Sequence, residues 1–533
     1  MNGETNTEAV HSEQQIVAQP ETSTDLPSAG SVELMEGLKA SPTTQEATKD
    51  APVEQSHDSA EQNATGLHND DLQEVSAKEE AQLEESKVEV QPVSDLSKST
   101  ADATATTTKP VAAEERPQTT EESTEIPAYL YKAIEKVASE QGFTAGEFNL
   151  EFDVGSNKGD GFVGQMFKAL ITEGARKQVF LCKIPPLNEA RRRQFNTMSS
   201  FSRETLAYKT LLPTIFAYQE EKGVAREDGF FNVPKCYYAE CDEATEESVI
   251  IMEDLRTMDY RMWNKMKPVN YEHARLTMQH LGRLHAVSLA LKRDRPEAFE
   301  QFKVPDSLVV MMSDGSPLAL MMTQMVNNAK ETLEPHETKE RAKMEKLAEN
   351  VRQEMQSCAD GASAEPYTVL GHGDCWVNNF MFNYKNKVPD NIILLDWQIT
   401  RYVSPVLDIA YFLFCCTDEE FRRRYYDEMI NIYHNSLGTL LEKLGHSPQE
   451  VFPRTALIRQ LRRYGKFGIL MAVFLVPMMC TRNEDLYDMD ETAEKYRDSN
   501  ELDVNAITTN TNKSAYSKRI SAVIRDIVRY GYL

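Results

Sequence analysis

The sequence predicts an α+β fold with two lobes, a small antiparallel sheet followed by a larger helical part, and an acidic tail in front of both. Residues 1–126 contain no Phe, Trp, Tyr or Cys. Residues 127–255 hold runs in which apolar and polar residues alternate, which is typical of half-buried strands. In residues 256–533 apolar residues recur mainly every three or four positions, which favours helices with one buried face. We therefore expect a tail, a sheet lobe and a helical lobe in this order.

The first 126 residues are too polar to bury a core. They carry 27 acidic and 7 basic side chains, whereas the remaining residues carry 57 acidic and 51 basic ones. Low hydrophobicity combined with high net charge predicts disorder. Such a tail is either a solvated, self-repelling spacer or an arm that binds a protein partner. Because no basic stripe accompanies the acidic residues, we expect no nucleic-acid partner.

The compartment expected from the sequence is the cytoplasm. The first ten residues, MNGETNTEAV, lack the apolar core of a secretory signal. The most apolar stretch, residues 467–480, is too short to span a bilayer and contains Pro477, so a buried helix is expected there and no membrane span. The eight cysteines show no paired CxxC spacing, which predicts free thiols in place of a disulfide or zinc framework.

The expected elements of the sheet lobe alternate between helices and hairpins. Residues 127–142 show helical spacing and end at a glycine, as many helices do. Residues 148–186 alternate like antiparallel strands around turn-rich segments. Residues 196–221 predict a long amphipathic helix, and residues 233–255 predict two further strands joined by an acidic turn.

The helical lobe is expected to begin after residue 255, where the strands largely stop. One helix is predicted over residues 271–292 and a charged one over residues 336–355. The block VLGHGDCWVNNFMF then places a polar loop between short apolar runs, and a second apolar run, NIILLDWQ, follows it. Helices rich in aromatic residues and Met follow. The Met- and aromatic-rich segments LVVMMSDGSPLALMMTQM and FGILMAVFLVPMM could line an apolar acceptor pocket or belong to the core.

The segment GDGFVG is a candidate phosphate-binding loop. It places Gly159, Gly161 and Gly164 at a spacing that lets a backbone approach phosphates. A Rossmann site would need a helix to begin at these glycines, whereas the residues that follow alternate like strands. The alternative is an ordinary glycine-rich hairpin turn.

A lysine lies inside the apolar strand VFLCKIPP. Lys183 would be costly to bury without a partner, and Glu204 on the following helix is the expected partner. The alternative is a surface lysine whose stem covers apolar surface, with a glutamate that is unrelated to it.

The polar loop and the second apolar run supply oxygen-bearing side chains. Asp374 could accept a proton from an attacking hydroxyl, while Asn379 and Asp396 could hold magnesium, which prefers oxygen ligands and substrate phosphates. The alternatives are carboxylates that cap a turn and a strand end. His372 is expected to be a packed, hydrogen-bonded structural residue.

The order of these groups narrows the choice between the alternatives. A glycine loop, a strand lysine, a helix glutamate, the hinge-like IMEDL, an HxD with Asn five residues later and a strand that ends in Asp form the set used by protein-kinase-like phosphotransferases. Only eight residues separate Asp396 from Pro405, and no Ala-Pro-Glu segment is present. Because a peptide-docking activation loop has no room there, the sequence favours a small-molecule acceptor.

The blocks HGDCWVNNFMFNY and IILLDWQITRYVSPVLDIAYFLF resemble the insect ecdysteroid-kinase-like family, also described as CHK-kinase-like, a relative of choline kinases and aminoglycoside phosphotransferases. The blocks KGDGFVGQMFKALI, FLCKIPP, FSRETLAYKTLLP, IIMEDL and LGRLHAVSLAL resemble the rest of the family in the same order. The similarity covers residues 127–533. It implies a protein-kinase-like fold and ATP- and magnesium-dependent phosphorylation of a small-molecule alcohol, with ecdysteroids leading and other lipophilic or xenobiotic alcohols next. The alternatives are a choline- or ethanolamine-type kinase and an inactive pseudokinase that binds nucleotide or ligand.

The resemblance also implies roles for single residues. Lys183 would orient the phosphates of the nucleotide and pair with Glu204. Asp374 would be the catalytic base, and Asn379 and Asp396 would hold magnesium.

Further implied roles concern the adenine and the catalytic loop. Backbone groups from Glu253 to Leu255 would meet the adenine, and Asp408 would anchor the loop. Two positions depart from related patterns. Gly164 stands where this family is expected to have a serine, which leaves phosphate contacts to the backbone. Gln398 stands where protein kinases have the glycine of Asp-Phe-Gly, although Asp-x-Gln is usual for this family.

Overall fold

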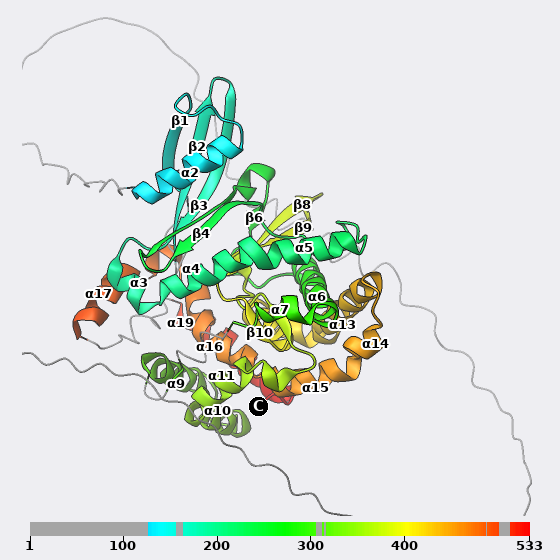
Figure 1. Cartoon of the computed structure of the whole chain (residues 1–533). Helices are drawn as coiled ribbons and strands as arrows, with labels where there is room; N and C mark the ends of the chain where they lie inside the picture. The colour runs from blue at the N-terminus through cyan, green and yellow to red at the C-terminus, as the bar shows by residue number, and fades with distance from the viewer. Residues whose placement is uncertain (1–125, 156–163, 305–311, 314–315, 487, 500–511) are drawn as a thin grey trace, which may run out of the picture. The chain divides into compact units, whose positions relative to one another are not determined.

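The structure is a computed structural model, and every described residue belongs to the unit Gln118–Leu533 (Figure 1). The acidic tail, apart from Ile126, lies outside the described residues. The predicted α+β class is confirmed, because an antiparallel sheet is followed by a part built mainly of helices. The described ranges are 126–155, 164–304, 312–313, 316–486, 488–499 and 512–533.

The sheet contains five strands in the order β1-β2-β3-β5-β4, and each neighbouring pair is antiparallel. The predicted hairpins are present. The strands are β1 (Asn149–Val154), β2 (Gln165–Glu173), β3 (Arg176–Ile184), β4 (Cys236–Asp242) and β5 (Glu247–Glu253).

Helix α2 (Ala128–Glu140) packs its apolar residues on one face of this sheet. Its Ile134 belongs to the same buried cluster as Phe180 and Ile251. The apolar face of the helix, which repeats every 3.6 residues, and the apolar face of the sheet, which repeats every second residue, therefore form one core. The helix ends as predicted at Gly142, which has a φ of 83° and thus adopts the left-handed conformation that favours glycine at this position.

The long helix predicted over residues 196–221 is present with a change of winding in its middle. It consists of α4 (Thr197–Leu206), a π-helical turn over Ala207–Leu211, and α5 (Leu212–Glu221). Figure 1 shows α4 and α5 in line, between the sheet and the helical part. Pro213 has no N–H to donate to the carbonyl one turn earlier. The N–H of Leu212 instead donates to the carbonyl of Ala207, five residues back, so the extra residue is accommodated beside the proline.

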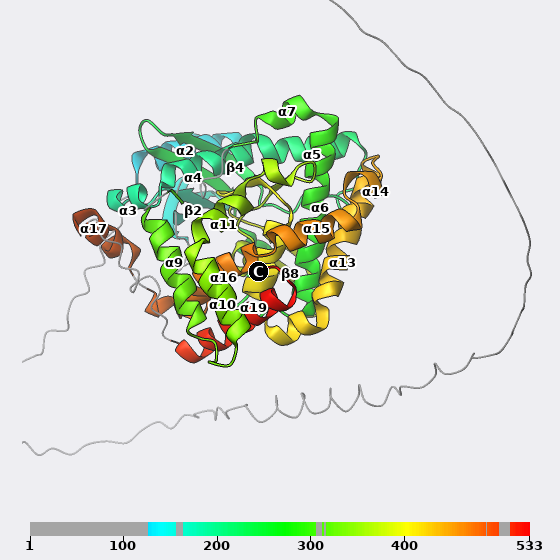
Figure 2. The same ribbon diagram turned by 90° about the horizontal axis from the view of Figure 1, so that it is seen from below.

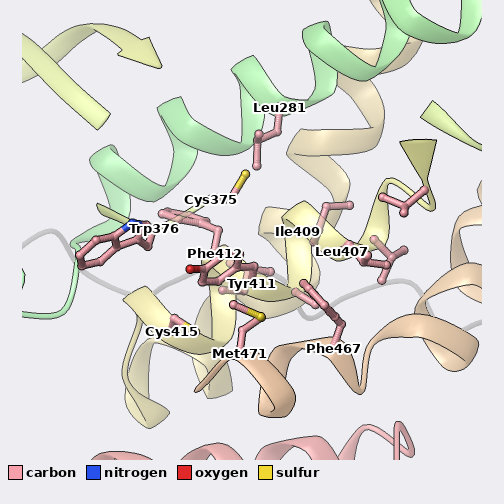
Figure 3. Packing of buried hydrophobic residues seen from close by; sticks show 14 of the residues in the cluster. Leu281, Cys375, Trp376, Leu407, Ile409, Tyr411, Phe412, Cys415, Phe467 and Met471 are labelled. Carbon is pink, nitrogen blue, oxygen red and sulfur yellow. The ribbon is translucent and has the colours of Figure 1, made fainter. Parts of the chain in front are cut away.

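The helical part is built around two buried helices, α12 (Val406–Cys416) and α16 (Phe467–Met479), which pack against each other. Figure 3 shows part of this packing. Helix α16 is buried apart from Phe474, which confirms the predicted buried helix. Helix α6 (Tyr271–Asp294), also predicted, packs along α13 (Glu419–Lys443).

The remaining helices pack around this centre, except that α3 and α17 pack on each other near the sheet, and Figure 2 shows α9, α10 and α11 beside α16 and α19. They are α3 (Glu189–Gln194), α7 (Pro296–Glu300), α9 (Pro317–Lys330), α10 (Thr338–Glu349), α11 (Val351–Ala359), α14 (Pro448–Val451), α15 (Arg454–Tyr464), α17 (Met489–Ser499) and α19 (Lys513–Arg529).

One helix expected from the sequence is divided in two. The charged segment 336–355 forms α10 and part of α11, with a break at Asn350. The side chain of Asn350 donates to the carbonyl of Lys346 over 2.8 Å. Asparagine competes in this way with the backbone hydrogen bonds of a helix, so the helix ends there.

Two small sheets interrupt the helical part, although few strands were expected after residue 255. One has the order β6-β8-β9 and the other pairs β10 with β7. Both lie around the polar loop, because β7 precedes it and β8 follows it. The strands are β6 (Arg261–Met262), β7 (Val369–Gly371), β8 (Phe380–Lys385), β9 (Val388–Leu394) and β10 (Arg401–Val403).

Within the described part of the chain, no single helix has the length and apolar character needed to cross a bilayer. A pair of helices, Phe467–Met479 and Asn483–Asp498, meets the length and composition requirement together but is bent by 99°. All eight cysteines are free thiols.

Candidate active site

A cavity lies between the sheet and the helical part. Of the residues predicted to bind nucleotide or metal, those that line it are Gly164, Lys183, Glu204, Asn379 and Asp396 and the segment from Glu253 to Leu255. Gly159 and Gly161 lie outside the described residues. The other lining residues are Gly155, Met166, Leu181, Tyr208, Pro234, Met252, Arg256, Met262, Asn378, Met381 and Leu395.

Lys183 connects the two sides of this cavity. Its Nζ donates to Glu204 Oε2 over 2.7 Å and to Asp396 Oδ1 over 2.9 Å. The lysine is 7% exposed and the glutamate 1%, so the predicted ion pair is present and the alternative of a surface lysine is wrong. Burial opposes the positive charge, but Asp396 and Glu204 together raise the pKa of Lys183 above its usual value. The ammonium group is therefore charged at neutral pH.

Gly164 lies against the ammonium end of this lysine side chain. A Cβ added at Gly164 would be 3.2 Å from Lys183 Cε, 3.2 Å from Phe201 Cζ and 3.2 Å from the Ile184 carbonyl oxygen. These distances are shorter than ordinary van der Waals contact, so a serine would displace its neighbours. Little room is therefore left for a side chain at this position, directly before β2.

The strand β5 ends at the cavity in a hinge-like segment. The N–H of Lys235 donates to Glu253 Oε1 over 2.7 Å. Arg256 binds both oxygens of Asp254, at 2.7 and 2.9 Å, and its Nη1 donates to the carbonyl of Gly155 over 3.0 Å. The sequence analysis missed Arg256, although an arginine two residues after an aspartate at a strand end is a signal for such a pair.

Asp374 is held at three points beside this cavity. Asn379 Nδ2 donates to Asp374 Oδ2 over 2.8 Å and also to its carbonyl oxygen over 3.0 Å. The hydroxyl of Tyr411 donates to Asp374 Oδ1 over 2.8 Å. The Asp374 N–H donates to His372 Nδ1 over 3.2 Å. Burial raises the pKa of Asp374, and the nearby charge of Asp396 raises it further.

The backbone of this loop is fixed from α12. Asp408 accepts hydrogen bonds from the N–H of His372 at 2.7 Å, from the N–H of Gly373 at 2.9 Å and from His285 Nε2 at 3.0 Å. Burial opposes the charge of Asp408, but the hydrogen bond and charge of His285 lower its pKa to about 2. His285 was not predicted as a functional residue, because the sequence does not distinguish it from the other polar residues of α6.

His372 is a packed residue, as the sequence indicated. Its ring is fully buried and lies 4.8 Å from the ring of Trp397. Because Nδ1 accepts the N–H of Asp374, Nε2 carries the proton and donates to the carbonyl of Leu395 over 2.8 Å. The histidine thus joins the polar loop to the segment that carries Asp396.

Asn379 and Asp396 are two residues at the cavity that could hold a magnesium ion. The amide nitrogen of Asn379 is bound to Asp374, which directs Oδ1 away from that carboxylate, and the side chain of Asp396 is 26% exposed. Both line the cavity and offer oxygen donors. No group of three or more His, Cys, Asp or Glu in the described ranges could hold a metal ion by itself. An ion that takes its other ligands from phosphates and water agrees with this arrangement.

Several solved structures resemble the chain. A Plasmodium vivax ethanolamine kinase is 13% identical, with a TM-score of 0.36, and the match covers 76% of this chain and 90% of the kinase. The GDP complex of aminoglycoside 2′-phosphotransferase-IIIa is 12% identical, with a TM-score of 0.35 and coverages of 76% and 99%. A spectinomycin phosphotransferase in complex with ADP and spectinomycin is 10% identical, with a TM-score of 0.28 and coverages of 69% and 93%.

No curated protein shows significant similarity to the sequence. A model of one family, described as the ecdysteroid kinase-like family, matches residues 158–446. This match spans more than half of the 533 residues and includes the lysine, the glutamate, the polar loop and the residues that follow β9. The chain belongs to the ecdysteroid kinase-like family.

Proposed function

We propose that the protein transfers the γ-phosphoryl group of ATP, with magnesium, to a hydroxyl group of a small molecule. Membership of the family supports the reaction class. The observation that carries the proposal is the Lys183 network, because one buried ammonium group holds both Glu204 and Asp396 at a cavity that Asn379 also lines. Such a charged group at a cavity wall suits a phosphate chain.

In this proposal the base of the nucleotide lies between apolar side chains. Met166 and Leu181 come from the sheet, whereas Met381 and Leu395 come from the helical part, and all four line the cavity. Backbone groups from residue 253 to residue 255 meet the edge of the adenine. The phosphates then extend towards Lys183, whose ammonium group binds their oxygens.

The chemical step needs an acceptor oxygen, a leaving group and a destination for one proton. The acceptor hydroxyl attacks the γ-phosphorus as the bond to the bridging oxygen breaks, ADP leaves, and the hydroxyl proton passes to the carboxylate of Asp374. Magnesium, when bound by Asn379 and Asp396, supplies positive charge to the phosphate oxygens. Burial that raises the pKa of Asp374 makes this carboxylate a better proton acceptor.

For the acceptor we propose an ecdysteroid or another lipophilic alcohol, on the strength of the family. The Met-rich segments do not decide the choice. Met321, Met322 and Met325 of α9 are buried in the main core with Met471 of α16, and residues 305–311 lie outside the described residues. The core interpretation of these Met side chains is therefore the better supported one.

We also propose a reducing compartment such as the cytoplasm as the place of this reaction. The support is the free thiol state of all eight cysteines, because an oxidising compartment favours paired cysteines.

The experiment that tests the proposal uses the purified full-length protein with labelled ATP, with magnesium or with EDTA. The acceptors are a panel of ecdysteroids, plant-derived alcohols, choline and ethanolamine, and products are identified by mass spectrometry. A phosphorylated steroid that forms only with magnesium is the expected result. Binding of ATP with no transfer to any alcohol would instead favour a pseudokinase. Transfer to choline or ethanolamine alone would favour a choline- or ethanolamine-type kinase in place of a kinase for lipophilic alcohols.

A further inference from the structure

Tyr411 is a buried residue of α12 that the chemical step described above does not use. The residue is 2% exposed, and its ring lies edge-on to Phe467 with 6.4 Å between centroids. Figure 3 shows it packed among Phe412, Met471 and Phe467. Its hydroxyl donates to Asp374 Oδ1 over 2.8 Å. Burial raises the pKa of Tyr411 well above its usual value, so the hydroxyl keeps its proton and stays a donor.

The two oxygens of Asp374 are held by donors from different parts of the chain. Asn379 holds Oδ2 from within the same loop, whereas Tyr411 holds Oδ1 from a buried helix. The last torsion angle of an aspartate is soft, with a broad and roughly two-fold distribution. The backbone alone therefore leaves the carboxylate free to rotate, and a hydrogen bond on each oxygen fixes which lone pairs face the acceptor.

Helix α12 holds the polar loop at two points. Asp408 binds the backbone N–H groups of His372 and Gly373, and Tyr411 lies three residues later. Residues three positions apart lie on the same face of a helix. One face of α12 thus positions the loop backbone through Asp408 and the Asp374 carboxylate through Tyr411.

We propose that Tyr411 is a positioning residue for phosphoryl transfer, which fixes the rotation of the Asp374 carboxylate so that one oxygen faces the acceptor hydroxyl. The inference rests on the proposed function, in which Asp374 takes the proton of the acceptor. Loss of this alignment removes part of the rate gain that comes from holding reacting groups in place. Tyr411 is not among the residues that line the nucleotide cavity, so the binding of ATP does not depend on its hydroxyl.

The test is the full-length Tyr411→Phe variant, which keeps the ring and its packing and removes one hydroxyl group. The matched control is Tyr426→Phe, because Tyr426 is also buried, at 5% exposure, and also loses a hydrogen bond, 2.7 Å long and made with Tyr532. We expect Tyr411→Phe to lower kcat by about 10- to 100-fold with an unchanged KM for ATP. The control should keep the kcat of the wild type even when its Tm falls by as much as the Tm of Tyr411→Phe.

A wild-type kcat in Tyr411→Phe, or an equal loss of kcat in the control, would overturn the inference. So would a loss of ATP affinity that matches the loss of kcat, because the hydroxyl would then act on nucleotide binding.

A crystal structure of Tyr411→Phe separates this inference from the proposed function. Should the wild type phosphorylate no alcohol, the proposed function fails while the structure of the variant still decides the role of the hydroxyl. An Asp374 carboxylate that is rotated, or that occupies two orientations, supports the positioning role. A carboxylate that keeps its orientation without the hydroxyl rules that role out.

Discussion

Asp374 combines two properties that a catalytic base requires. It is held in one orientation by donors on both oxygens, and burial raises its pKa. We expect Asp374→Asn to bind magnesium-ATP nearly as well as the wild type, because Asp374 does not line the nucleotide cavity. Phosphoryl transfer should fall by about 100- to 10,000-fold, since the amide cannot accept the proton. Calorimetry measures the affinity and single-turnover assays the rate. Near-normal turnover would remove Asp374 from the role of base.

A substitution at Gly164, directly before β2, shows how closely the chain packs against Lys183. Gly164→Ala adds a Cβ that would lie 3.2 Å from Lys183 Cε, so the lysine must shift away from its two carboxylates. We expect the KM for ATP to rise several-fold. Gly438→Ala is the control, because its Cβ would meet nothing closer than 3.5 Å and a glycine within a helix is replaced at a gain in stability. Equal KM values in both variants would show that β2 has room for a side chain.

Single residues also show where sequence reasoning succeeds and where it ends. The Lys183–Glu204 pair could be predicted because an unpaired lysine in an apolar strand is costly to bury. Tyr411 could not, since a tyrosine on an apolar helix looks like any other core aromatic until the loop is placed beside it. His285 was missed for the same reason, because its partner Asp408 lies 123 residues away in the sequence. Arg256 differs, because its pair with Asp254 lies two residues away and carried a local signal.

Among the elements, α12 holds the polar loop through Asp408 and Tyr411. The carboxylate of Asp408 accepts two backbone N–H groups of the loop. In Asp408→Asn the amide nitrogen faces one of these N–H groups, and a buried donor loses its acceptor, which costs about 1–3 kcal/mol. We expect a lower Tm and a lower kcat in this variant.

The same carboxylate makes stability depend on pH. The folded pKa of Asp408 is about 2 and its ordinary value is 3.8, so the shift stabilises the fold by about 2 kcal/mol above pH 4. This contribution is lost as the pH falls from about 4 to about 2, because the carboxyl must then bind a proton. Denaturant titrations between pH 2 and pH 6 measure it. A difference between wild type and Asp408→Asn that stays constant over this range would contradict the assignment.

Helices and strands in which the apolar pattern repeats several times could be predicted from the sequence, whereas the breaks within helices could not. Helices α2 and α6 and strands β2 and β3 repeat their apolar pattern often enough to be recognised. The π-helical turn depends on one missing N–H at Pro213, and the break between α10 and α11 depends on the side chain of Asn350. Strand β6 has two residues and β10 has three, too few for any period to appear.

For the molecule as a whole, every described residue of the site lies in the unit Gln118–Leu533. We expect a protein that lacks residues 1–117 to keep the kcat and KM of the full-length protein in the same acceptor assay. The acidic residues removed with this segment supply none of the groups named in the reaction. A large fall in turnover after this truncation would mean that the tail takes part in the reaction.

The bond between Lys183 and Asp396 joins positions 213 residues apart. During synthesis the sheet leaves the ribosome long before Asp396 has been added to the chain, so the newly made lysine has Glu204 as its first counter-charge and receives the second only later. Because domains emerge and fold from the N-terminus onwards, the nucleotide cavity completes itself late. A nascent chain stalled before residue 396 would hold a finished sheet without a finished site, so the nucleotide binding that we propose would begin only after residue 396 has been added.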